Sequence, residues 1–149
     1  LYGPNDNYDL ETSHVIPALI KKFHQAKINN SENVEVWGSG EVYREFLYVK
    51  DFADACVFCL QNIDANSIYN KGISQLNIGS GIDLKICDLS LIIKKIVGYN
   101  GKIVFNKSMP DGTRKKLLDI SRITSFGWIP HYELKNGLME TYKYFLEND

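Results

Sequence analysis

The sequence predicts a mixed α/β fold in a chain of 149 residues, which is long enough to bury one hydrophobic core. Some segments place apolar residues at every third or fourth position, as a helix with one buried face does. Others are short apolar or β-branched runs close to glycines, as strands are. Helical and strand patterns alternate irregularly without a fixed repeat. We therefore expect an α/β chain in which some strands belong to a sheet whose other members lie outside it.

The expected elements follow from these periods and from capping residues. The expected strands are apolar runs, at residues 34–37, 45–49, 76–79, 82–86 and 102–105. The expected helices have a polar capping residue in front of an apolar face, and they begin after Thr12 or Ser13, at Asp51, at Asp88 and at Asp119. A last amphipathic helix is expected from about residue 133 to residue 147.

The composition argues against nucleic-acid and membrane binding. Lysine and arginine total 17 against 18 acidic residues, so the formal net charge is −1. The densest basic cluster, residues 114–116, is too small to bind a polyanion, so any bound anion should be small. No run of 18 apolar residues occurs, and we expect no membrane-spanning helix.

The three cysteines, Cys56, Cys59 and Cys87, predict neither a redox pair nor a metal site. Cys56 and Cys59 have C-x-x-C spacing, but they fall inside an expected helix instead of at its start, where the helix dipole lowers a thiol pKa. No second ligand pair has zinc-site spacing. We expect buried, apolar cysteines in a reducing compartment. Because the chain starts at Leu1, without methionine and at a strand-to-turn junction, we also expect a longer parent protein.

Several motifs carry a family resemblance. In chain order they are LYGPNDN at residues 1–7, SHVIPAL at 13–19, WGSG at 37–40, REFLYVKD at 44–51, PDGT at 110–113 and KLLD at 116–119. In this order and at these separations they resemble the GDP-L-fucose synthase family, the GDP-4-keto-6-deoxy-D-mannose 3,5-epimerase/4-reductases among the extended short-chain dehydrogenases. The resemblance spans nearly the whole chain. SHVIPAL together with PDGT and KLLD makes it specific.

The resemblance implies a cytoplasmic, NADPH-dependent homodimer built from a Rossmann domain and a smaller C-terminal substrate domain. The G-x-G-x-x-G fingerprint of a dinucleotide site is absent from the sequence. Residues 1–149 are therefore expected to be the substrate-binding C-terminal portion, with strands and a helix that complete a Rossmann sheet. The NADP-binding N-terminal portion, with the family's catalytic serine, tyrosine, lysine and cysteine, is expected to be absent from the chain, which alone should be inactive.

The resemblance also assigns site residues. His14 matches the family's proton donor in epimerisation, and the ordinary imidazole pKa of about 6.5 suits that role. His14 and Leu1 match positions beside the cofactor. The expected contacts to a GDP-sugar come from Lys22, Trp37, Arg44, Asp111 and Lys116.

Arg44 is the expected diphosphate ligand, because a guanidinium can hold two phosphate oxygens at once. The alternative is an exposed arginine paired with Glu41 or Glu45. Lys22 matches a position at which the family has an arginine. A lysine there has the same charge but lacks the planar guanidinium that can bind two oxygens at once. His24 and His131 lack metal-site neighbours and are expected on the surface.

Several functions remain open from the sequence. The chain can be the substrate-side part of an enzyme that makes GDP-L-fucose, or of a reductase or epimerase/reductase for a related GDP-keto-sugar such as a heptose. It can also be a nucleotide-sugar-binding module without catalysis. The SHVIPAL segment argues against a relative that acts on UDP- or dTDP-sugars. His14 alone does not separate an epimerase from a reductase, because the partner cysteine is not in the chain.

Overall fold

Helices and short strands alternate in the computed structural model, which describes residues 1–148. The strands are β1 (Asn33–Trp37), β2 (Tyr43–Glu45), β3 (Asp83–Lys85), β4 (Lys102–Asn106) and β5 (Lys115–Lys116). The helices are α1 (Val15–Ile28), α2 (Val49–Asn62), α3 (Ala65–Tyr69), α4 (Ile86–Val97), α5 (Ser121–Ser125) and α6 (Leu134–Asn148). The helices of this part of the chain lack the length and apolarity that a membrane crossing requires.

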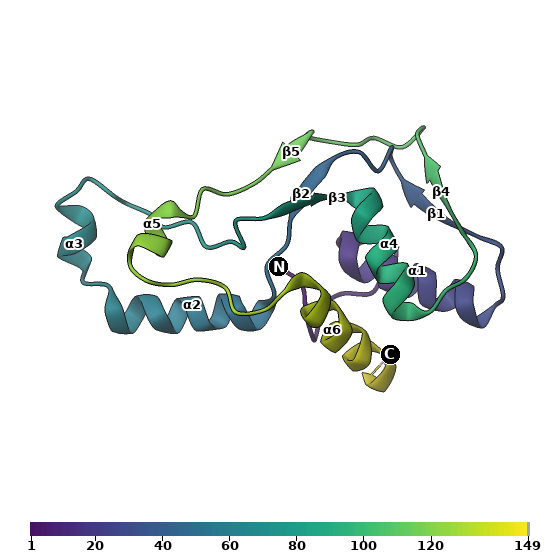
Figure 1. The fold of residues 1–149 in the computed structure, drawn as a ribbon, viewed down its shortest axis with the longest axis horizontal. Helices are drawn as coiled ribbons and strands as arrows, with labels where there is room; N and C mark the ends of the chain where they lie inside the picture. Colours follow the sequence, from purple (N-terminus) through teal and green to yellow (C-terminus); the bar gives the residue numbers. More distant parts are fainter. Residues whose placement is uncertain (149) are drawn as a thin grey trace.

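The main core lies where α1, α4 and α6 gather beside the parallel pair β1–β4, at the right of Figure 1. Phe23 of α1 and Leu89 of α4 are fully buried there, because each helix turns its apolar stripe toward the other. Val34 and Val36 bury one face of β1, and the residues between them face solvent, as the two-residue period of a strand requires.

A second, three-stranded sheet crosses the top of the molecule in the order β3–β2–β5 (Figure 1). Strand β2 is antiparallel to β3 and parallel to β5, which comes from the distant segment near residue 115. This arrangement brings the segments around residues 44 and 116 together and forms one wall of the site.

An arm made of α2, α3 and α5 extends from this body to the left of Figure 1. It has only a small core, formed by Leu47, Ala55, Ile123 and Trp128. Apolar side chains of α2 remain open to solvent, and Leu60 is 87% exposed. The arm is therefore the least self-contained part of the described chain.

Several sequence expectations about elements were wrong. Residues 76–79 form no strand among the described residues. The strand expected at 45–49 overlaps β2 only at Glu45, and Val49 already belongs to α2. Thr12 and Ser13 do not cap α1, whose N-cap position is His14. Cys56, expected to be buried, is exposed.

Asp51 does not cap α2 and has a different role. It is 1% exposed, and its two carboxylate oxygens accept the backbone N–H groups of His131 at 2.9 Å and Tyr132 at 3.0 Å. It thus fastens the start of α2 to the segment that leads into α6.

Candidate functional site

All the residues assigned from the resemblance line one cavity of about 520 Å³. Its walls come from the start of α1, from β1 and β2, and from the segment between β4 and β5. The assigned residues in its lining are Leu1, His14, Lys22, Trp37, Arg44, Asp111 and Lys116. Residues far apart in sequence thus share one concave surface, which is the usual form of a small-molecule site.

His14 marks one end of the cavity. It is the N-cap residue of α1, and its imidazole makes no hydrogen bond to any of residues 1–148. The turn before it is fixed by Asp9, whose Oδ1 accepts N–H bonds from Glu11 and Thr12 and the Thr12 hydroxyl. These bonds lower the pKa of Asp9 below its usual value. The ring is therefore presented on an ordered turn with its polar atoms available.

Lys22 and Trp37 mark the other end. With a helical rise of about 1.5 Å per residue, Lys22 lies about 12 Å along α1 from His14. Its ammonium group is 5.0 Å from the centre of the Trp37 ring and donates a hydrogen bond to the carbonyl oxygen of Glu35 at 3.2 Å. Burial lowers the pKa of Lys22. Trp37 is 54% exposed, so the indole offers area to a flat ligand group.

Arg44 and Lys116 form a pair of like charges in the lining. They are direct partners in the parallel β2–β5 register, so their side chains leave the same face of the sheet. Neither forms an ion pair with a carboxylate of the described residues. Nearby Lys85 and Lys115, in contrast, pair with Glu41 at 2.7 Å and Asp83 at 3.1 Å. Two like charges on neighbouring strand positions repel each other, and an anion bound beside them would relieve that repulsion.

The Arg44 guanidinium also organises the loop that carries Asp111. It donates to the carbonyl oxygens of Tyr43 at 2.7 Å, Thr113 at 2.6 Å and Asp111 at 3.2 Å. Arg44 pairs with neither Glu41 nor Glu45, so this alternative from the sequence is wrong for the described structure.

The Asp111 carboxylate is partly committed to the backbone. Its Oδ1 accepts the N–H group of Ser39 at 2.6 Å, and this bond lowers the pKa of Asp111. Gly38 leaves room for this contact, because a Cβ atom there would collide with Asp111 Oδ1. One carboxylate oxygen remains for a ligand.

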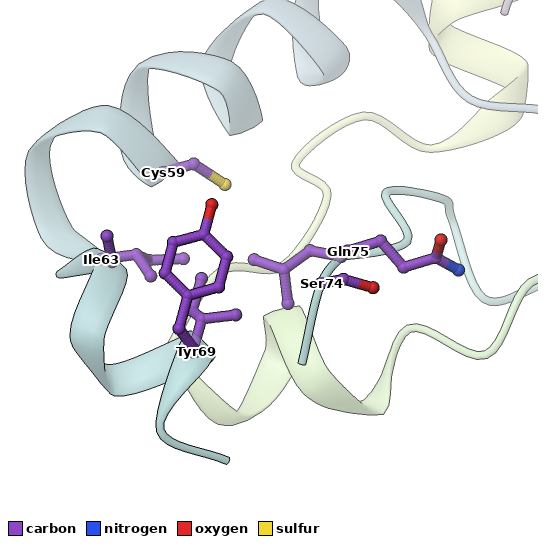
Figure 2. Close-up of a pocket in the computed structure, with 8 residues that line it drawn as sticks. Cys59, Ile63, Tyr69, Ser74 and Gln75 are labelled. Atoms are coloured by element: carbon purple, nitrogen blue, oxygen red, sulfur yellow. The ribbon is translucent and has the colours of Figure 1, made fainter. Parts of the chain in front are cut away.

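A second hollow, of about 350 Å³, lies on the arm between α2 and α3 (Figure 2). Cys59 and Tyr69 face it. The pKa of the Cys59 thiol is raised, mainly by burial and to a smaller extent by the neighbouring Cys56. A thiol with a raised pKa stays protonated and unreactive near neutral pH. No group of three or more metal-binding side chains occurs within residues 1–148. We therefore locate the candidate site in the larger cavity.

The other two histidines lie outside this cavity. His24 is only partly exposed, and its Nδ1 atom is 3.0 Å from the Tyr142 hydroxyl. His131 is largely exposed, with its ring 3.6 Å from Asp54.

Comparisons with known proteins agree with this geometry. Residues 1–72 match the model of the NAD dependent epimerase/dehydratase family. The chain is 47% identical over 148 residues to GDP-L-fucose synthase 1 of Arabidopsis thaliana and 45% identical over 150 residues to GDP-L-fucose synthase of Escherichia coli. This chain is similar in sequence to the GDP-L-fucose synthases. The match includes 99% of the chain in both cases, but only 44% and 47% of the two relatives.

Solved structures support the same relationship and the mixed α/β fold. A GDP-6-OMe-4-keto-L-xylo-heptose reductase from C. jejuni superposes with a TM-score of 0.91 at 36% sequence identity. The match includes 99% of this chain and 52% of the reductase chain. A GDP-L-fucose synthetase from Naegleria fowleri gives a TM-score of 0.88 at 27% identity, with 99% and 43% covered. The chain thus spans about half or less of each protein that it resembles.

Sequence reasoning gave no site role to Glu45, a charged residue of the cavity lining. Glu45 was considered only as a partner for Arg44, yet its carboxylate accepts hydrogen bonds from Gly81, Ser80 and Leu118. The acidic residue next to Arg44 in the REFLYVKD segment was the available signal. The sequence did not show which backbone groups would reach it.

Proposed function

We propose that this chain is the substrate-binding portion of an NADPH-dependent GDP-4-keto-6-deoxy-D-mannose 3,5-epimerase/4-reductase that makes GDP-L-fucose. The observation that carries the proposal is the set of groups that share one cavity. An unbonded imidazole, the neighbouring cations Arg44 and Lys116, and an exposed indole all line it. A diphosphate flanked by a sugar and a flat base offers a partner for each of these groups.

His14 is the proposed proton donor. The protons on C3 and C5 of a 4-keto sugar are acidic because the carbonyl stabilises the carbanion that their loss leaves. Epimerisation needs a base on one face and an acid on the other. The base is proposed to lie outside this chain, and His14 returns the proton from the α1 side of the cavity.

The nucleotide half is proposed to lie along Lys22, Trp37 and Arg44. The diphosphate contacts Arg44 and Lys116, while Trp37 offers its ring face and Asp111 its remaining oxygen to hydrogen-bond donors of the nucleotide. Lys22 supplies a single charge beside the indole.

Neither glycine turn among the described residues has the form of a dinucleotide-binding loop. The two GSG turns, at 38–40 and 79–81, lead into β2 and β3 and not into a helix, and neither has the G-x-G-x-x-G spacing. We therefore propose that NADPH is held mainly by a portion outside residues 1–149, with Leu1 and His14 at the edge of its site. When bound, the cofactor supplies the hydride that reduces C4. A cytoplasmic homodimer belongs to the same proposal.

A second candidate is a reductase for a related GDP-keto-sugar. The similarity to the GDP-heptose reductase favours it, and a GDP-L-colitose synthase of Yersinia pseudotuberculosis is 40% identical over 98% of the chain. Both candidates need the same nucleotide contacts. They differ in whether protons at C3 and C5 exchange.

The test is the reaction of the full-length natural protein with GDP-4-keto-6-deoxy-D-mannose and NADPH in D₂O. We expect NADPH oxidation together with deuterium at C3 and C5. His14→Gln should slow deuterium incorporation by about 10²- to 10⁴-fold, the usual size of a general acid's contribution, with GDP affinity nearly unchanged. Reduction without deuterium would favour the reductase, and failure of both readouts would overturn the proposal.

A further inference from the structure

The shortest strand of the molecule carries a proposed phosphate ligand. Strand β5 has two residues, Lys115 and Lys116, and its register places Lys116 directly beside Arg44. Two cations in this position repel each other, and a strand of this length has few ladder bonds to oppose them. Contacts beyond β-pairing help to hold this segment against β2, and on the side before β5 the Arg44 guanidinium makes them with the carbonyl oxygens of Thr113 and Asp111.

Glu45, at the next position on β2, holds the segment on the side after β5. Its Oε2 accepts the backbone N–H of Leu118 at 2.9 Å, two residues after β5. Its Oε1 accepts the N–H of Gly81 at 2.6 Å, and the Ser80 hydroxyl is 3.4 Å from the same oxygen. One partly buried carboxylate therefore joins β2, the turn before β3 and the end of β5.

The turn at residues 79–81 is shaped around this carboxylate. A Cβ atom built on Gly79 would lie 2.5 Å from Glu45 Oε1 and 3.0 Å from the carboxyl carbon. Only a residue without a side chain lets the turn approach so closely. Hydrogen bonds to an ionised acceptor are about twice as strong as neutral ones, so the contacts of Glu45 stabilise this arrangement more than ladder bonds of equal number would.

We propose that Glu45 is a positioning residue for the proposed GDP-sugar site, and that it holds Lys116 beside Arg44 as a preformed cradle for the second phosphate of a nucleoside diphosphate. This inference rests on the proposed function, because it assumes that the cavity binds a diphosphate. Glu45 acts through Lys116. Its own charge would repel phosphate, and each of its two oxygens already accepts a backbone N–H group.

The test compares GDP with GMP in the full-length natural protein by isothermal titration calorimetry. Glu45→Gln keeps the size of the side chain but turns an N–H₂ group toward one of the two backbone donors. One of the hydrogen bonds from the Gly81 and Leu118 N–H groups is therefore lost. We expect GDP affinity to fall about tenfold, the effect of losing one charge-assisted contact, and GMP affinity to fall less than about twofold. Glu41→Gln is the matched control, because Glu41 is an exposed carboxylate of the same region that pairs with Lys85, and its variant should bind both nucleotides normally.

A double-mutant cycle separates positioning from general damage. If Glu45 acts through Lys116, Glu45→Gln should add little in a Lys116→Ala background, where the ligand that it positions is already gone. Equal losses for GDP and GMP, or additive losses in the cycle, would show a merely structural role and overturn the inference. A wild-type protein that binds neither nucleotide would overturn the proposed function first. If the wild type binds GDP and Glu45→Gln binds it equally well, the positioning role of Glu45 is rejected and the proposed function is not.

Discussion

Arg44 has two tasks that only a guanidinium combines. It faces the cavity beside Lys116, and it donates to the carbonyl oxygens of Tyr43 and Thr113 through one nitrogen. A lysine at this position carries the charge, but it has neither the planar fork nor donors on two nitrogens. The residue thus couples the shape of the 110–113 loop to the binding of an anion.

Arg44→Lys should therefore lower GDP affinity by about 10- to 100-fold, which corresponds to the loss of one or two charge-assisted hydrogen bonds. Calorimetric titration of GDP into the full-length protein measures this change. Arg114→Lys, at an exposed arginine on the neighbouring strand segment, is the control and should bind GDP normally. A lysine variant at position 44 that binds like the wild type would show that the fork is unimportant.

Asp111 makes the stability of the loop depend on pH in a specific window. Its hydrogen bond from the Ser39 N–H lowers the pKa of the carboxyl below its ordinary value of 3.8. A group whose pKa is lower in the folded state stabilises the fold above the unfolded pKa and loses that effect as the pH falls through the folded pKa. The melting-temperature difference between wild type and Asp111→Ala should stay constant from pH 7 to about pH 5 and shrink only below about pH 4. A difference that already shrinks between pH 7 and pH 5 would contradict the assignment.

At the scale of elements, periodic segments were predicted well and unpaired ones were not. The apolar stripes of α1 and α6 and the alternation in β1 were visible in the sequence and are confirmed, as are a helix that ends at Val97 and a strand from Lys102. Residues 76–79 have a strand-like composition but find no ladder partner in the described chain. Strand β5 is held by distant contacts, which a local pattern does not record.

Asp51 shows the same limit and gives a stability prediction. An aspartate near a helix start indicates capping, but here both oxygens accept backbone N–H groups of His131 and Tyr132 inside the protein. Asp51→Asn keeps one acceptor and leaves one of these N–H groups unpaired, which should lower the free energy of unfolding by about 1–3 kcal/mol. Asp88→Asn, in the first turn of α4, is the control and should cost less than about 1 kcal/mol. Urea unfolding of both variants measures the difference, and equal effects would reject the buried role of Asp51.

At the scale of the whole molecule, the resemblance located the cavity and physical patterning alone did not. From residue types only, His14 is interpreted more readily as a capping or partly buried histidine, and Asp111 equally well as a turn aspartate. The matched motifs selected these two, and the structure brings them to the same cavity. Glu45 was missed because its partners are 36 and 73 positions away along the chain.

The proposed division of labour between this chain and an NADPH-binding portion outside it gives the last prediction. The proposed nucleotide contacts all lie in the body of this chain, whereas its glycine turns do not form a dinucleotide site and its arm exposes apolar residues of α2. Titration of the isolated 149-residue chain, once circular dichroism shows it folded, should therefore give binding of GDP, weaker binding of UDP and no binding of NADPH. The same chain should not oxidise NADPH with any keto-sugar substrate. NADPH binding would mean that residues 1–149 contain a cofactor site that their glycine spacing does not indicate. A folded chain that binds none of the three would mean that the cavity reaches its binding shape only when the exposed arm is covered by the rest of the protein.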